Sequence, residues 1–260
     1  MIAANLAVSL ARADREVLVL DWGGGVKGAA WLLGAEPAAD LLEVVRAGAR
    51  ARDAFAVGSA GVRVVAGART AAALGRLPAR EAARLEQALE TLQAGVDMVI
   101  VDAAPNDLPA CAAADELVVV TQADAQSMTE TYRFLKRLVP VCGLRQARIL
   151  INRLRIPARA DRIFGNLSIA ADRFLSVTLE LEGRIPYDEC MERSTQLRQV
   201  VVDAVPDAPA SRALRDCAEA TLRWPDTGPR EPSAFAGRLV AITRDFGALK
   251  TNGLPTRIPE

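Results

Sequence analysis

The stretch IAANLAVSLARADREVLVLD at residues 2–21 joins a helical pattern to a short apolar run that ends in Asp21. Small and apolar residues recur at helical spacing over 2–13, which predicts a helix that packs against a core. The run at 16–20 is apolar and β-branched, as is typical of a parallel strand covered on both faces. The stretch therefore predicts an α/β fold with Asp21 at the carboxyl end of a buried strand.

The same alternation continues along the chain. Further strands are predicted at 62–66, 98–101, 116–121, 148–151 and 179–185. Helices are predicted at 39–47, 79–94, 128–139, 159–174 and 208–222. We expect a doubly wound, mostly parallel sheet flanked by helices, and ligands of such sheets bind at the carboxyl ends of the strands.

Composition narrows the classes of function. The 260 residues include 32 basic and 32 acidic side chains, so no overall charge favours nucleic acid, and none is expected as a partner. The chain has no histidine, which excludes Ser-His-Asp catalysis and histidine-containing metal sites. Its four cysteines are widely spaced in apolar or helical surroundings, which suits reduced thiols in the cytoplasm.

The chain is expected to consist of one domain at 1–223, a linker rich in proline and charge at 224–232 and a tail at 233–260. Within the tail, apolar residues fall on one face of a short helix, with two arginines near them: Phe235, Leu239, Ile242, Phe246, Arg238 and Arg244. Such a helix can lie in a membrane interface at 233–246. Docking as a last helix on the domain explains the same stripe equally well.

The first candidate site follows Asp21. The sequence WGGGVKG at 22–28 places Gly23, Gly25 and Gly28 in a G-x-G-x-x-G spacing, as in dinucleotide-binding folds. Such folds also have an acid at the end of the next strand, where this chain has Ala66 and Gly67. It is not a Walker A loop, because that motif has its lysine directly after the last glycine. A plain glycine-rich turn remains an alternative.

Two further strands end in polar residues. Asp102 follows MVIV at 98–101, as the Walker B acid that holds Mg²⁺ through water follows its strand, although aspartate at this place also caps helices. Asn152 follows RILI at 148–151, where its amide could contact a base edge, although asparagine is also a common turn residue.

In this order, the segments resemble the MinD/ParA-type branch of the P-loop ATPases over residues 2–222. The matching segments are AANLAVSLA, VLVLD with the glycines after it, LLG at 32–34, the strand ending in Asp102, AAADELVVVT at 112–121, the pair Asn152 and Arg153, and GRIPYD at 183–188. The segments SMTETY at 127–132 and PDAPASR at 206–212 are similar to those of the FlhG-like flagellar-number regulators.

The resemblance implies an ATP-dependent, dimeric switch that regulates flagellar number and placement. It implies ATP and Mg²⁺ as cofactors, with Asp102 as the magnesium acid through water, and nucleotide contacts from Asp21, Asp102, Asn152, Arg153 and Pro186. Asp21 is the nearest candidate for a catalytic carboxylate. The implied partners are an FlhF-like GTPase or flagellar assembly and transcription factors, with peripheral membrane contact through 233–246.

Three departures from the family bear on this expectation. Met1 falls just beyond the family's Walker A Ser/Thr, so the first strand and the phosphate-binding loop have no counterpart in residues 1–260. The second acid of D-x-D is Gly23, and the glycine expected after the Walker B acid is absent from DAAPN at 102–106. Hydrolysis is therefore expected to be deficient. Either translation starts upstream or the protein is a degenerate relative.

Three functions follow as hypotheses. The first is an FlhG-like ATP-switch regulator. The second is a non-enzymatic binding module of the same fold that acts through protein partners. The third is a dinucleotide-dependent enzyme that uses the glycines after Asp21.

Overall fold

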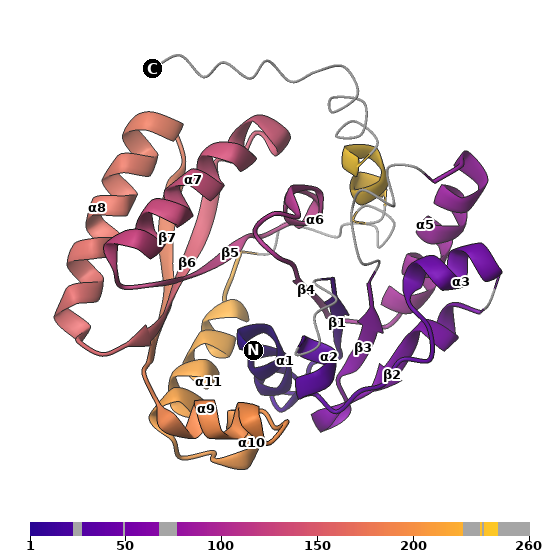
Figure 1. Ribbon diagram of the computed structural model, residues 1–260, viewed down its shortest axis with the longest axis horizontal. Helices are drawn as coiled ribbons and strands as arrows, with labels where there is room; N and C mark the ends of the chain where they lie inside the picture. Colours follow the sequence, from indigo (N-terminus) through magenta and orange to yellow (C-terminus); the bar gives the residue numbers. More distant parts are fainter. Residues whose placement is uncertain (23–27, 49, 68–76, 226–234, 236, 244–260) are drawn as a thin grey trace.

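The computed structural model describes residues 1–22, 28–48, 50–67, 77–225, 235 and 237–243. Its parallel strands and the longer helices lie where the sequence predicts them, and the chain has an α/β fold (Figure 1). The strands are β1 (Val17–Asp21), β2 (Phe55–Val57), β3 (Arg63–Ala66), β4 (Met98–Asp102), β5 (Val118–Gln122), β6 (Gln146–Leu154) and β7 (Thr178–Pro186). The longer helices are α1 (Ile2–Ala11), α3 (Leu41–Ala47), α5 (Ala79–Gln93), α7 (Ala125–Cys142), α8 (Pro157–Leu175) and α11 (Pro209–Thr221).

Short elements lie between these and were not predicted. They are β2, the helices α2 (Ala29–Leu32), α6 (Leu108–Ala113), α9 (Glu189–Gln196) and α10 (Val201–Ala204), and two 3-10 turns, Ala51–Ala54 and Ser59–Gly61. None of them is longer than eight residues, which leaves little length for a clear hydrophobic period.

Local chemistry explains where the helices begin and end. Asp40 caps α3 by accepting from the Glu43 N–H, and Asp124 caps α7 by accepting from the Ser127 N–H. Pro157 is the first residue of α8, a position whose N–H has no hydrogen-bond partner within the helix, so the missing proline N–H costs nothing. Gly143 ends α7 at φ 63°, a left-handed conformation that glycine adopts without strain.

The hydrogen-bonded strands among the described residues form two sheets, where one was predicted. The first has the order β2-β3-β1-β4, and the second has the order β5-β6-β7. All pairs are parallel except β2 with β3. The outer edges of β4 and β5 have no strand partner in the described part of the chain, and Val120 of β5 is 45% exposed.

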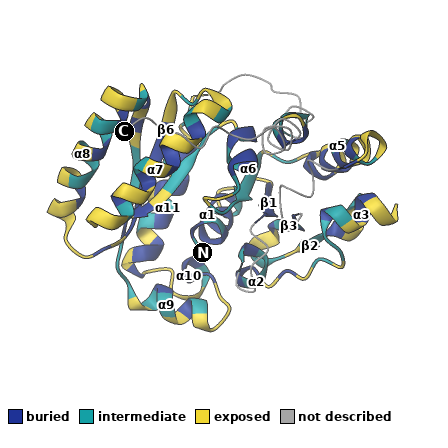
Figure 2. Ribbon diagram, turned by 45° about the horizontal axis from the view of Figure 1, so that its top comes forward, coloured by how far each residue is buried: buried dark blue, intermediate teal, exposed yellow. Residues whose placement is uncertain are grey.

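Shared helices hold the two sheets in one layer. On one face, α1, α2, α10 and α11 form a single apolar cluster with strand residues of both sheets, among them Val19, Ile100, Val118 and Leu150. On the other face, α3 and α5 cover the first sheet, and α7 and α8 cover the second (Figure 2). The layer is therefore continuous in packing but interrupted in hydrogen bonding between β4 and β5.

The tail packs on the domain. Residues 237–243 are helical, Leu239 and Val240 are 0% and 3% exposed, and Phe235 and Ile242 pack against the same core (Figure 1, yellow). Phe246, Arg244 and most of the linker lie outside the described residues. Packing of the tail helix on the domain, the alternative to membrane contact, thus accounts for the apolar residues of the tail that the structure describes. Among the helices that the structure describes, none is long and apolar enough to cross a membrane.

Candidate functional site

Two carboxylates meet at the carboxyl edge of the first sheet. β1 and β4 are neighbours, and their register places Asp21 opposite Asp102. Asp21 is 7% exposed, and its Oδ2 accepts a hydrogen bond from the Ala30 N–H at 2.9 Å. A side chain at Gly28 would collide with the Asp21 carboxylate, so glycine is required where the chain enters α2.

The electrostatics of this pair suit a cation. Burial raises the pKa of Asp102, the positive amino terminus at Met1 opposes the rise, and the Asp21 charge adds to it. In the described part of the chain, no cationic side chain forms an ion pair with Asp21 or Asp102. Carboxylate oxygens are ligands that Mg²⁺ prefers, usually one or two beside waters and phosphates. The donor set therefore fits Mg²⁺, although no group of three or more metal-binding side chains occurs among the described residues.

Trp22 connects the strands at this edge, a role that nothing in the sequence indicated beyond an aromatic residue after a strand. Its indole Nε1 donates to Asp107 Oδ2 at 2.8 Å, and its backbone N–H donates to the Asp102 carbonyl at 3.1 Å. The ring is 2% exposed, and Gly67 lies so close that a Cβ there would overlap it. Trp22 therefore fixes the ends of β1, β3 and β4 relative to one another.

A second group lies at the carboxyl edge of the other sheet. Asn152 is 8% exposed, and its Oδ1 accepts from the Arg153 N–H at 2.8 Å, a bond that does not use its two amide donors. Arg153 has φ 56°, and the ladder between β6 and β7 is irregular there before Leu154 pairs with Pro186. The irregularity places Asn152 and Arg153 just before Leu154, the residue that pairs with Pro186.

Side chains that the sequence did not single out support this second group. Arg153 Nη2 pairs with Glu192 of α9 at 2.6 Å, and Arg155 stacks 3.6 Å from the centre of the Tyr187 ring. The Tyr187 N–H donates to the Leu154 carbonyl at 2.9 Å. These contacts tie α9 to the end of β6.

The structure brings the predicted residues together in two separate groups. Asp21 and Asp102 are on the first sheet, and Asn152, Arg153 and Pro186 are on the second. Within the described residues, no hydrogen bond or ion pair joins the groups. Neither group includes a phosphate-binding loop in the described part of the chain. Gly23, Gly25 and Lys27 lie outside the described residues.

Comparisons with known proteins agree with this arrangement. No family model matches the chain. The antiactivator FleN of Pseudomonas aeruginosa is 31% identical over 228 residues, which cover 86% of this chain and 81% of FleN. The MinD cell division protein of Aquifex aeolicus superposes with a TM-score of 0.66 at 16% identity, over 88% of this chain and 93% of that one. MinD of Pyrococcus horikoshii, solved with Mg-ADP, gives 0.61 at 18% identity, over 85% and 89%.

Proposed function

Because the chain belongs to the MinD/ParA-type ATPase family, we propose that it is a FleN-like regulator of flagellar number and placement that binds Mg-ATP as a switch. The observation that carries this proposal is the placement of Asp102 beside Asp21, buried and without a cationic side-chain partner in the described residues. A magnesium ion would offset the repulsion between these carboxylates. Asn152 and Pro186 would lie against the base.

The interruption between β4 and β5 supports a place for one more parallel strand. Both open edges are apolar, and Ile100 of β4 and Val118 of β5 pack against the same apolar cluster, to which α1 contributes. Unpaired edges inside a layer are costly, and one parallel strand would satisfy both of them. We infer that the phosphate-binding loop of the family would reach the site at the end of such a strand.

Magnesium-dependent nucleotide binding tests the proposal. In isothermal titration of protein purified from its native cells, Mg-ATP should bind, and Asp102→Ala should weaken this binding at least about tenfold, a loss of about 1.4 kcal/mol. Asp172→Ala, on the exposed face of α8, is the matched control and should bind like the parent. Equal binding by Asp102→Ala and its parent would show that Asp102 is not the magnesium acid.

A non-enzymatic binding module is the second candidate. It is favoured by Gly23 in place of the family's second acid. The intact mass of the native protein separates the candidates. A mass larger by about twenty residues, enough for one strand and a loop, favours the ATP switch. The mass of residues 1–260 favours action through protein partners alone, such as a second copy, an FlhF-like GTPase or flagellar transcription factors.

A peripheral membrane role for 233–246 would require the tail to leave the domain, because Leu239 and Val240 are buried against it. Sedimentation with anionic liposomes tests this role. Loss of sedimentation on removing residues 233–260 would support it, and unchanged sedimentation would exclude it. The dinucleotide hypothesis is disfavoured because the negative charge of a pyrophosphate bound after Asp21 would be repelled by the carboxylates of Asp21 and Asp102.

A further inference from the structure

A cavity of about 300 Å³ lies apart from the two groups of candidate nucleotide residues. Its walls come from three separate stretches of the chain, which are residues 32–34 at the end of α2, Ser59, and residues 198–204 in and before α10. Ser59 lies just before β3 begins, whereas Asp21 and Asp102 lie where β1 and β4 end. The cavity is therefore at the amino edge of the first sheet, and its volume is at the lower end of the range for small-molecule sites.

The lining combines apolar surface with a few polar groups, as is usual for such sites. Leu32 and Val200 are buried and supply part of the apolar surface. The Asp203 carboxylate already has partners in the protein, because it accepts a hydrogen bond from the Ser59 hydroxyl and lies 2.6 Å from Arg12 Nη2. These partners neutralise Asp203, so the lining does not require a cationic ligand.

Arg198 supplies a cation to the lining that is open to a ligand. Its Nη2 pairs with Glu36 at 2.9 Å, and the Glu36 side chain is 77% exposed. Such a surface pair is weak, so an acidic ligand can replace Glu36 at little cost. Arg198 Nη1 has no hydrogen-bond partner in the described part of the chain, and a guanidinium can hold a carboxylate through two parallel N–H groups.

The backbone holds Arg198 in a conformation that residues with side chains seldom adopt. Its φ is 63°, in the left-handed region. The Arg198 N–H donates to the Thr195 carbonyl at 3.1 Å, and the Gln199 N–H donates to the Ser194 carbonyl at 2.9 Å. Residues persist in this region where the surrounding structure fixes them, and they are frequent at ligand sites.

The short helix α2 connects the cavity to the carboxylate pair. At its end, the Trp31 carbonyl accepts a hydrogen bond from Arg198 Nε at 3.2 Å. At its start, the Ala30 N–H donates to Asp21 Oδ2 at 2.9 Å. Because α2 has a single turn, a displacement of Arg198 at one end reaches Asp21 at the other.

We propose that the cavity is a second binding site, which takes a small organic acid with an apolar body and transmits its occupancy to Asp21 through α2. Arg198 holds the acid group in place of Glu36, and Leu32 and Val200 cover the apolar body. The binding of the acid is independent of the proposed nucleotide function. The meaning of the link to Asp21 rests on that function.

Benzoate is the probe, and benzamide is its uncharged counterpart of nearly the same shape. In amide NMR spectra of the full chain, millimolar benzoate should cause saturable shifts at residues 32–34, 59–61 and 198–204. Benzamide should bind at least about tenfold more weakly, because it lacks the charge that Arg198 recognises. The Ala30 amide should shift with the same dissociation constant as the cavity residues.

Arg198→Asn removes the guanidinium and introduces a residue that tolerates the left-handed conformation. It should weaken benzoate binding at least about tenfold. Arg184→Gln is the matched control, because Arg184 also pairs with an exposed carboxylate, that of Asp161, and is 44% exposed against 43% for Arg198. Glu36→Gln removes the competing carboxylate without touching the backbone of Arg198, and it should tighten benzoate binding severalfold.

Three results would overturn the site. They are no benzoate-dependent shift at the cavity, equal binding of benzoate and benzamide, and equal benzoate binding by Arg198→Asn and Arg184→Gln. If Arg198→Asn does not fold, unchanged affinity in Glu36→Gln overturns it instead. Shifts at the cavity without a response of Ala30 would overturn the link to Asp21. No nucleotide is present in these measurements, so their failure is distinct from a failure of Mg-ATP binding.

Discussion

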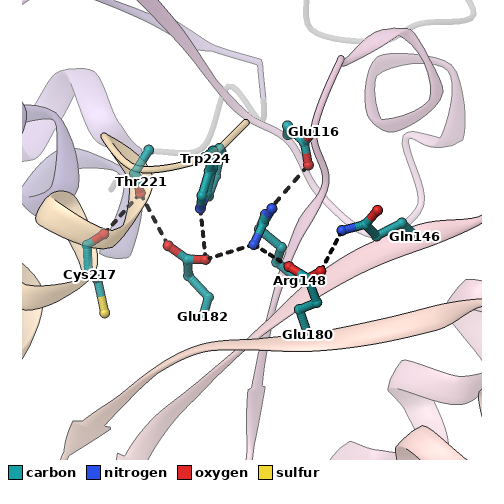
Figure 3. A network of polar contacts seen from close by, with 8 residues as sticks. All are labelled: Glu116, Gln146, Arg148, Glu180, Glu182, Cys217, Thr221 and Trp224. Carbon is teal, nitrogen blue, oxygen red and sulfur yellow. Dashed lines mark hydrogen bonds and ion pairs between the residues drawn. The ribbon is translucent and has the colours of Figure 1, made fainter. Parts of the chain in front are cut away.

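The two sheets manage buried charge in opposite ways. At the carboxyl edge of the first sheet, Asp21 and Asp102 lie side by side, and burial raises the pKa of Asp102. Toward the amino edge of the second sheet, Arg148 lies among Glu116, Glu180 and Glu182 and stacks on Trp224 (Figure 3). The first pair has no cationic side-chain partner among the described residues, whereas a guanidinium of the protein lies among the carboxylates of the second cluster. The difference agrees with the proposed binding site on the first sheet and with a structural role for the second cluster, which is called the frame below.

The largest expected effect comes from breaking the frame. Arg148→Met removes the cation from the cluster that contains Glu182, a carboxylate whose pKa burial already raises. We expect the free energy of unfolding to fall by about 3–5 kcal/mol, as when one partner of a buried ion pair is lost. Urea denaturation measures this. Arg173→Met, on exposed α8, should cost less than about 0.5 kcal/mol, and equal losses in the two variants would contradict the frame.

The corresponding change on the first sheet should have the opposite sign. Asp102→Asn removes a buried charge that repels Asp21, so the free energy of unfolding at neutral pH should rise, by no more than about 1 kcal/mol. The raised pKa means that the folded state binds the proton more tightly, so this stability is present below the ordinary value of 3.8 and is lost as the pH rises through the raised pKa. Denaturation at several pH values should show this slope in the parent and not in Asp102→Asn.

If Asp102→Asn instead destabilised the protein, the first sheet would have to be interpreted differently. It would mean that the carboxylate is satisfied in the folded state and that the first sheet is as self-sufficient as the second. Adding Mg²⁺ then distinguishes a site from a frame. A magnesium-dependent gain in stability that is confined to the parent would still indicate a cation site.

The hydrophobic pattern was sufficient to place the parallel strands, because buried parallel strands are short continuous apolar runs, as in β1 and β4. It could not reveal that β4 and β5 are not paired with each other. A strand at an open edge that helices cover is as apolar as a strand with neighbours on both sides. It also missed β2, an antiparallel strand of three residues, because alternation over so few positions carries no signal.

The site was predictable where backbone position decides it. Asp21 and Asp102 end β1 and β4, and parallel register brings them to one edge of the first sheet, while Asn152 lies near the end of β6 in the second sheet. Trp22, Tyr187 and Glu192 were not predictable, because their roles depend on tertiary contacts with Asp107, Arg155 and Arg153. The Arg148 cluster was missed for the same reason, since its members come from separate strands.

The smallest effect concerns the edge where the second sheet meets the proposed base. Arg153→Ala loses the ion pair with Glu192, and because both side chains are about half exposed, the free energy of unfolding should fall by less than about 1 kcal/mol. The variant should nevertheless lower the preference for ATP over GTP severalfold, because α9 is no longer tied beside Asn152. Competition titrations measure that preference, with Glu192→Gln as the variant that loses the charge and keeps the side-chain shape. If ATP still binds and both variants keep the parent's preference, the second sheet takes no part in choosing the base, and its carboxyl edge belongs to the frame.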